Sequence, residues 1–192
     1  MRQGFTSRKV RDSNFKSLAP FKKGIEDPEE KKRYKFQTAY LIQEFLVAAK
    51  SLKELNLKSN KIGDDGMIII SKAFAGHHLS KLELLDLTQT NMTAESFRVM
   101  TNTMRGKQNL STLILDKNNL GTTYSFSTIA HIIATGHKLK VISMKSCSLN
   151  DMFGVPFSEA LKSNRGLVRF NFYDNELTSR TLVQLAHAIK ET

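Results

Sequence analysis

Apolar residues along the chain follow a pattern that recurs five times. In each copy the first, fourth and sixth positions are apolar, the ninth is Asn or a substitute, and the eleventh is again apolar. Successive copies begin 30, 28, 29 and 28 residues apart. Their first residues are Leu52, Leu82, Leu110, Leu139 and Leu167. A near-constant period of this length is the sequence signature of a stacked-repeat architecture.

The spacing within each copy predicts a short strand followed by an inward turn. Apolar residues two positions apart point to one face of a strand, and the residues between them point to the other. At the turn, the side chain of Asn60, Asn118 or Asn175 can hydrogen-bond backbone groups that the bent chain leaves unpaired. Thr90 and Cys147 take this place in the other two copies. We interpret Cys147 as a turn residue, since no basic neighbour or paired His suggests a reactive thiolate.

Between the strands the apolar period becomes helical in four of the five copies. These apolar triplets are Met67, Ile70, Phe74; Phe97, Met100, Met104; Phe126, Ile129, Ile133; and Leu182, Leu185, Ile189. The fourth copy is irregular and offers Phe153, Phe157, Ala160 and Leu161 around Pro156. Thr93 and Thr178 are placed to cap their helices. Asp64 and Asp65 are expected in a first helical turn, where the helix dipole favours acids.

The chain resembles the leucine-rich repeat family, and its period resembles the ribonuclease-inhibitor-like subclass. The clearest match to that subclass is the stretch LKELNLKSNKIGDDG, in the first copy. The resemblance extends from Leu52 to about Thr192 and implies an α/β leucine-rich repeat solenoid of about five repeats. A curved parallel β-sheet would line the concave side of such a solenoid, and helices would line its convex side. We therefore predict a repeat domain over residues 51–192.

Residues 25–50 are predicted to form an N-terminal capping helix. Asp27 can cap this helix, and Pro28 suits its first turn. Ala39, Ile42 and Leu46 precede Leu52 by the distances at which a repeat's helix precedes the next strand. The helix should therefore cover the first strand of the solenoid.

Residues 1–24 are predicted to form an extended basic arm. The arm has seven basic residues and one acid, so it carries +6 of the chain's net charge of +11. The basic residues are Arg2, Arg8, Lys9, Arg11, Lys16, Lys22 and Lys23. Such an arm can be a solvated tail, or it can order against an acidic partner such as tubulin tails, nucleic acid or another protein.

Residue constellations typical of enzymes are missing from the sequence. It has no phosphate-cradling loop, nucleophile elbow or zinc-spaced Cys/His cluster. His77 and His78 are adjacent without a third ligand nearby, so we predict no catalytic residue, no cofactor and no metal. With one cysteine and no long apolar run, we expect an intracellular, cytoplasmic protein without a membrane span. Import into an organelle stays open because the basic start loosely resembles a transit peptide.

A binding role is better supported, because stacked strands align their outward side chains in columns. We call this surface the strand face and expect it to be concave. Its three columns are Glu54, Leu84, Thr112, Val141, Arg169; Asn56, Asp86, Ile114, Ser143, Asn171; and Lys58, Thr88, Asp116, Lys145, Tyr173. The candidate partner-binding residues are Leu84, Asp86, Ile114, Asp116, Val141, Lys145, Arg169 and Tyr173. Leu84, Ile114 and Val141 form an apolar patch with charges of both signs around it, which is typical of a protein interface.

These features predict a non-enzymatic scaffold or adaptor that holds other proteins within a multi-subunit assembly. The subclass resemblance suggests a cytoskeletal or ciliary assembly, including the axoneme. The main alternative is an RNA-binding ribonucleoprotein or organellar-complex subunit that uses the basic arm. A second is a small-GTPase regulator resembling Ran GTPase-activating protein, although the chain has fewer repeats and no acidic tail. A third is an actin-capping protein, since the repeat number resembles that of tropomodulin's actin-capping region, although its flanking actin-binding segments are not seen in this sequence. The last helix either docks its apolar edge (Val183, Leu185, Ala186, Ile189) on another chain or shields it with polar residues.

Overall fold

The computed structural model describes residues 27–29, 36–75, 77–104 and 109–190 of the 192-residue chain. The basic arm predicted over residues 1–24 lies outside the described residues. In the part of the chain that is described, no helix is long and apolar enough to cross a membrane.

The five copies of the sequence pattern form five short parallel strands in one sheet, in the order β1-β2-β3-β4-β5. The strands are β1 (Glu54–Asn56), β2 (Leu84–Asp86), β3 (Thr112–Ile114), β4 (Val141–Ser143) and β5 (Arg169–Asn171). Each strand pairs with the strand of the next repeat, as repeated strand-to-helix units of one handedness require. The predicted α/β solenoid of five repeats is confirmed.

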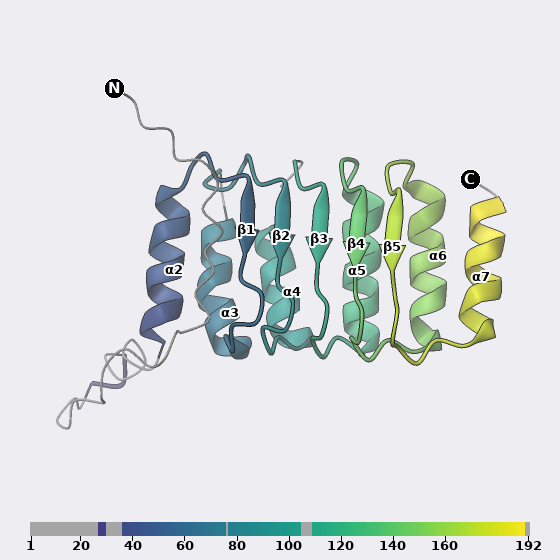
Figure 1. Ribbon diagram of the computed structural model, residues 1–192, viewed down its shortest axis with the longest axis horizontal. Coiled ribbons are helices and arrows are strands. Elements are labelled where there is room, and N and C mark those ends of the chain that lie inside the picture. The colour runs from purple at the N-terminus through teal and green to yellow at the C-terminus, as the bar shows by residue number, and fades with distance from the viewer. Residues whose placement is uncertain (1–26, 30–35, 76, 105–108, 191–192) are drawn as a thin grey trace.

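Helices form a second layer behind the sheet, in chain order from α2 to α7 (Figure 1). The helical elements are α2 (Gln37–Ala48), α3 (Gly63–Ser71), η1 (Lys72–Phe74), α4 (Ala94–Thr103), α5 (Thr123–Thr135), η2 (Asp151–Phe153), α6 (Gly154–Ser163) and α7 (Ser179–Lys190). The irregular fourth repeat enters its helix through the 3₁₀ turn η2, and Pro156 lies in the first turn of α6, where it costs no hydrogen bond.

The core lies between the two layers. The predicted helical triplets of the first and third repeats are buried, as are Phe97 and Met100 in the second; Met104 is half-buried. The irregular fourth repeat buries Phe153 and Phe157, whose rings stack with centroids 5.0 Å apart.

The predicted apolar triplet of the fifth repeat lies on α7, but only one of its three residues is buried. Leu185 is buried, but the side chain of Leu182 is 66% exposed and that of Ile189 is 57% exposed. Corresponding positions in inner repeats are covered by the next repeat, and in the described chain no repeat lies beyond β5 and α7. The predicted apolar edge of α7 is therefore real, except that Leu185 is part of the core.

A residue with left-handed backbone geometry lies three positions after the end of each strand. Ser59, Gln89, Lys117, Ser146 and Asp174 stand at the same place in the five repeats and have φ between 52° and 61°. This conformation, uncommon for residues other than Gly, reverses the chain direction at the end of the strand. The turn brings the ninth-position residue inward, as the sequence predicts.

Asn118 ties two neighbouring turns together. Its side-chain oxygen accepts hydrogen bonds from the amides of Thr90 and Met92 in the preceding repeat, at 3.2 and 3.0 Å. Its amide nitrogen donates to the carbonyls of Leu87 and Leu115, both at 2.8 Å. Asn175 makes the equivalent hydrogen bonds between the fourth and fifth repeats. The predicted role of the turn Asn is confirmed, and it extends across repeats.

The predicted helix caps are present, and two carboxylates reinforce them from the neighbouring repeat. The hydroxyls of Thr93 and Thr178 accept the amide hydrogen bonds expected of N-caps. Asp64 in α3 also accepts from the amide and hydroxyl of Thr93 and from Ser96. Asp151 in η2 does the same for Thr178 and Thr181 of α7. The sequence suggests the dipole role of these acids but not this bridge between repeats.

These hydrogen bonds lower the pKa of both carboxyl groups. Partial burial alone would raise the pKa of Asp64, but the hydrogen bonds from Ser96 and Thr93 outweigh it. The hydroxyl of Thr178, followed by that of Thr181, lowers the pKa of Asp151 to about 2. The helix caps are therefore strongest when these acids are ionised.

Helix α2 packs against α3 at the start of the solenoid. Ala39 and Leu46 are buried and Ile42 is half-buried, on the face that the sequence predicts. The carboxylate of Asp27 accepts a hydrogen bond from the Glu29 amide at 2.9 Å. Asp27 lies ten residues before α2, whose own N-cap position is Phe36. Helix α2 covers Gln37–Ala48, whereas the sequence predicts a helix over residues 25–50, so α2 starts later and ends two residues earlier than predicted.

Candidate binding surface

The strand register aligns the outward side chains in the columns that the sequence predicts. Glu54 pairs with Leu84, Leu84 with Thr112, Thr112 with Val141, and Val141 with Arg169. The second column runs beside the first through Asn56, Asp86, Ile114, Ser143 and Asn171. The strand face is therefore one continuous surface formed by all five repeats.

Side chains of the second column mostly stabilise the ends of their own strands. The carboxyl or amide oxygens of Asn56, Asp86 and Asn171 each accept a hydrogen bond from the amide two residues later, at 2.9 to 3.1 Å. The Asp86 carboxylate also accepts from the hydroxyl of Thr88 at 2.6 Å, and only 8% of Asp86 is exposed. Asp86, a predicted partner-binding residue, thus has a local structural role.

Ile114 breaks this pattern at the centre of the sheet. Its apolar side chain cannot accept the hydrogen bond that Asx oxygens accept on three other strands. Beside it, the Asp116 carboxylate accepts instead from the Ser143 hydroxyl at 2.6 Å and the Lys145 amide at 2.9 Å. Asp116 therefore joins β3 to β4, and Ile114 is left without a local polar role.

The predicted apolar patch is less exposed than its sequence position suggests. Leu84, Ile114 and Val141 are all half-buried, because neighbouring strands lie only about 4.8 Å apart and their side chains cover one another. Ile114 lies directly beside Asp86 and Ser143 in the register. The patch is thus a shallow apolar area rather than a set of protruding side chains.

Charged and aromatic residues surround this patch on the side of β5. Arg169 is exposed, Lys145 is half-buried, and the ring of Tyr173 is 75% exposed. Toward β1, Lys53 and Glu83 form an exposed ion pair of 3.0 Å that crosses from the first repeat to the second. The rim of the strand face therefore carries charges of both signs.

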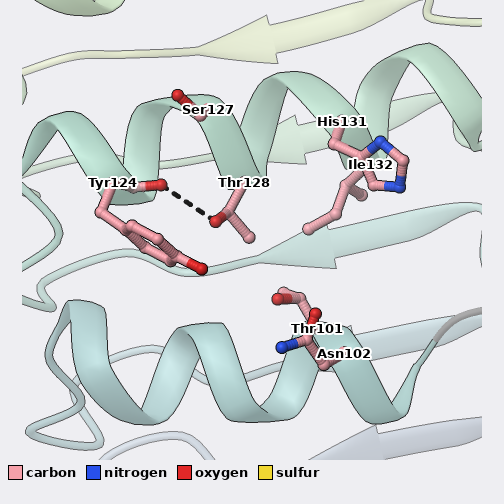
Figure 2. Close-up of a pocket in the computed structure, with 7 residues that line it drawn as sticks. All are labelled: Thr101, Asn102, Tyr124, Ser127, Thr128, His131 and Ile132. Atoms are coloured by element: carbon pink, nitrogen blue, oxygen red, sulfur yellow. Dashed lines mark hydrogen bonds between the residues drawn. The ribbon is translucent and has the colours of Figure 1, made fainter.

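A groove lies on the helical layer, between α4 and α5 (Figure 2). This shallow groove is lined by Thr101, Asn102, Tyr124, Ser127, Thr128, His131 and Ile132. The Thr128 hydroxyl donates to the backbone carbonyl of Tyr124 at 2.9 Å, and the Arg98 guanidinium lies 5.8 Å from the centre of the Tyr124 ring. The sequence analysis names none of these residues, because the apolar period marks the buried face of each helix and not the space between two neighbouring helices.

The described residues offer little for catalysis or for metal binding. No group of three His, Cys, Asp or Glu side chains among them could hold a metal ion. Burial raises the pKa of the Cys147 thiol to about 11, and the nearby charge of Asp116 adds to this effect. The Cys147 thiol donates to the carbonyls of Leu115 and Lys145 at 3.2 and 3.4 Å, so its predicted role as a turn residue is confirmed.

Known proteins are similar to this chain both in sequence and in fold. No protein-family model matches the chain. Mouse ribonuclease inhibitor is 29% identical over 147 residues, and the pig ribonuclease inhibitor is 28% identical over 141. Mouse NACHT, LRR and PYD domains-containing protein 3 is 25% identical over 141 residues. These alignments cover 73–76% of this chain but only 32%, 31% and 14% of the three relatives.

Two solved structures share the fold. The leiomodin-1 actin-binding site 2 aligns with a TM-score of 0.65 at 13% identity, over 79% of this chain and 87% of that one. The tropomodulin C-terminal domain of Caenorhabditis elegans aligns with a TM-score of 0.62 at 14% identity, over 80% and 92% of the two chains. The repeat pattern, the strand register and the sequence relatives agree, and the chain is a leucine-rich repeat protein of the ribonuclease-inhibitor-like subclass.

Proposed function

We propose that the chain is a non-enzymatic scaffold that binds a partner protein through its strand face, with Ile114 at the centre of the contact. The observation that carries this proposal is the apolar side chain of Ile114 at a position where three other strands place Asn or Asp. The local fold gains no hydrogen bond from Ile114, and a partner would gain an apolar contact.

The residues around Ile114 suit a protein partner. Leu84 and Val141 add half-buried apolar surface, and Tyr173 and Arg169 offer the aromatic and guanidinium groups that are enriched at interfaces. Nucleic acid is a poor fit, since the carboxylate of Asp116 stands among the basic residues of this face.

The substitution Ile114→Asn tests this proposal with little risk to the fold. Asn is the residue found at this position on β1 and β5, where its oxygen accepts the amide two residues later. Affinity purification of the chain with mass spectrometry should recover a partner with the wild type and lose it with Ile114→Asn. Val155→Lys, at an exposed site on α6, is the matched control and should retain the partner. Equal recovery with Ile114→Asn would argue against this face.

The wider assembly is proposed to be cytoskeletal, including the cilium and its axoneme. One of the structural neighbours is an actin-binding site, so filamentous actin is the first candidate partner to test by co-sedimentation. Microtubules are the second, because their acidic tails complement the basic arm of residues 1–24. Sedimentation with one filament and not the other would identify the assembly, and the protein would then act in the cytoplasm.

An RNA-binding subunit, of a ribonucleoprotein or an organellar complex, is the alternative that the arm's charge of +6 favours. Binding of this kind falls steeply with salt, since each phosphate contact releases a counterion. The alternative predicts RNA binding at low salt that is lost when residues 1–24 are deleted. RNA binding that survives the deletion, or that is absent at low salt, would count against it.

A further inference from the structure

Basic side chains gather at one end of the sheet, where the loops from α5 and α6 lead into β4 and β5 (Figure 1). Four of them are exposed, and we call these four the basic rim: Lys138, Lys140, Arg165 and Arg169. The segments 136–146 and 163–173, which contain the rim, have no Asp or Glu. The corresponding stretches of the first two repeats include Glu54 and Glu83. In the fourth and fifth repeats, acids of the same strands therefore do not balance the positive charge.

The two loops that carry the rim are packed against each other. The side-chain oxygen of Asn164, a buried residue, accepts from the Gly166 amide at 2.8 Å and orders the loop before β5. A Cβ atom at Gly166 would stand 2.7 Å from the His137 carbonyl oxygen, so this close approach to the loop before β4 needs glycine. The ammonium group of Lys138 donates in turn to the side chain of Asn109 at 2.7 Å. Contacts between repeats thus hold the backbone that carries the rim.

The dipoles of the neighbouring helices account for only part of this charge. Lys138 and Arg165 follow the last residues of α5 and α6 closely, where cations suit the negative end of a helix. Lys140 lies further on, directly before β4, and Arg169 is the first residue of β5. These two cations stand on the strand face, so the helix ends do not explain them.

An exposed apolar side chain lies among the cations. Val168 stands at the place in the fifth repeat that Lys140 takes in the fourth, and it is 80% exposed. Lys53 and Glu83 take this place in the first two repeats, are also exposed, and form an ion pair of 3.0 Å across them. Exposure is therefore a property of this place in the repeat. Beside Lys140, a carboxylate from another chain can take the role that Glu83 has beside Lys53.

We propose that the basic rim binds an acidic segment of the partner protein, with carboxylates on its cations and an apolar side chain on Val168. The inference rests on the proposed function, because it names the chemistry of the partner at the β4–β5 end of the strand face. Opposite charges across an interface select the partner and guide its approach.

An extended segment matches the spacing of the rim. The amides of Val168 and Arg169 both donate to the Lys140 carbonyl at 2.9 Å, so the three residues are direct neighbours. Alternate side chains of an extended chain lie about 7 Å apart on one face, and neighbouring strands lie about 4.8 Å apart. The long side chains of Lys140 and Arg169 can cover this difference. A segment with an apolar residue between acids on the same face therefore fits this site.

Nucleic acid fits the same end less well. Phosphates need cations, but they gain nothing from the exposed side chain of Val168. A nucleic acid backbone that continued along the rim toward β1 would also meet the exposed carboxylates of Glu83 and Glu54. A short acidic segment of a protein avoids both.

The experiment is fluorescence anisotropy of a labelled peptide, Glu-Ser-Glu-Ser-Leu-Ser-Glu-Ser-Glu, titrated with the purified full chain at low salt. The wild type should bind it, and the double variant Lys140→Glu/Arg169→Glu should bind at least about tenfold more weakly, since two attractive contacts become repulsive. Both side chains are exposed, so this rim variant should fold. Lys61→Glu/Lys72→Glu, at exposed sites in the first repeat, changes the net charge equally and should bind as the wild type does. This matched control separates the rim from the basic arm of residues 1–24.

Changes to the peptide test the chemistry of the ligand. Replacing each Glu of the peptide with Gln should abolish binding, and replacing its Leu with Ser should weaken it. A wild type that does not bind the peptide, or a rim variant that binds it equally well, would overturn the proposal. Tighter binding of a uridine oligonucleotide of equal charge, lost in the rim variant, would overturn it in favour of nucleic acid.

The partner that the wild type recovers distinguishes this inference from the proposed function. The rim variant should lose that partner, as Ile114→Asn should. If Ile114→Asn loses the partner while the rim variant keeps it and still binds the peptide, the proposed function stands and this inference fails. If only the rim variant loses the partner and the peptide, the rim is supported and the central role of Ile114 fails.

Discussion

Replacing Asn118 with Ala removes the side chain that ties the second and third repeats together. The side chain is 4% exposed, and its oxygen is the acceptor for the amides of Thr90 and Met92. A buried amide without an acceptor costs about 1 to 3 kcal/mol, so the two amides together should lower the free energy of unfolding by about 2 to 6 kcal/mol. The carbonyls of Leu87 and Leu115 add less, because each accepts from another donor.

This loss is large relative to the total stability of a domain, which is about 5 to 15 kcal/mol. Urea unfolding followed by far-UV circular dichroism would measure it as a lower midpoint. Asn119→Ala is the matched control, since Asn119 is exposed and only its backbone amide has a described hydrogen bond, to Met92. A loss below about 1 kcal/mol for Asn118→Ala would refute the reasoning, as would an equal loss for Asn119→Ala.

Three further predictions concern the core, a helix cap and the buried thiol. Phe153→Ala removes a ring that contacts the rings of Phe126, Phe157 and Phe172. In urea unfolding, this substitution should lower the free energy of unfolding by about 3 to 5 kcal/mol. Tyr124→Ala, at an exposed site, is the control and should lower it far less. The pKa of Asp151 is about 2 in the folded protein and near 4 in the unfolded chain. The ionised carboxylate should therefore contribute fully to stability above pH 4, and this contribution should be lost as the pH falls toward 2. The melting temperature of Asp151→Asn should lack this part of the pH dependence. The Cys147 thiol, with its pKa raised to about 11 by burial, should resist thiol reagents at pH 8 in the folded protein and react on unfolding; rapid labelling of the native protein would contradict this.

Much of the fold could be predicted from the sequence because it repeats. The spacing of Leu52, Leu55 and Leu57 defines one strand and its turn, and four further copies fix the order and register of the sheet. The inner helical triplets follow from the same period. The exposure of Leu182 does not follow from the repeat pattern. The pattern describes a position within a repeat, whereas burial depends on the repeat that covers it.

The positions of the strand-face residues could be predicted from the sequence, but the hydrogen bonds of their side chains could not. Strand alternation places Asp86 and Ile114 in one column, yet the sequence does not reveal that Asp86 accepts hydrogen bonds from Thr88. Likewise, the acids Asp64 and Asp151 suit the helix dipole, whereas their bridges to the next repeat depend on stacking distances. The groove between α4 and α5 depends on how two helices pack, which no local pattern encodes.

Titration calorimetry with the partner that the wild-type chain recovers tests the central claim most directly. The measurement compares the dissociation constants of the wild type, Ile114→Asn and Val155→Lys for that purified partner. An apolar contact at the centre of an interface contributes about 1.5 to 3 kcal/mol, so Ile114→Asn should bind at least about tenfold more weakly. Val155→Lys should bind as the wild type does. Equal affinities for all three proteins would contradict a partner-binding role for the strand face.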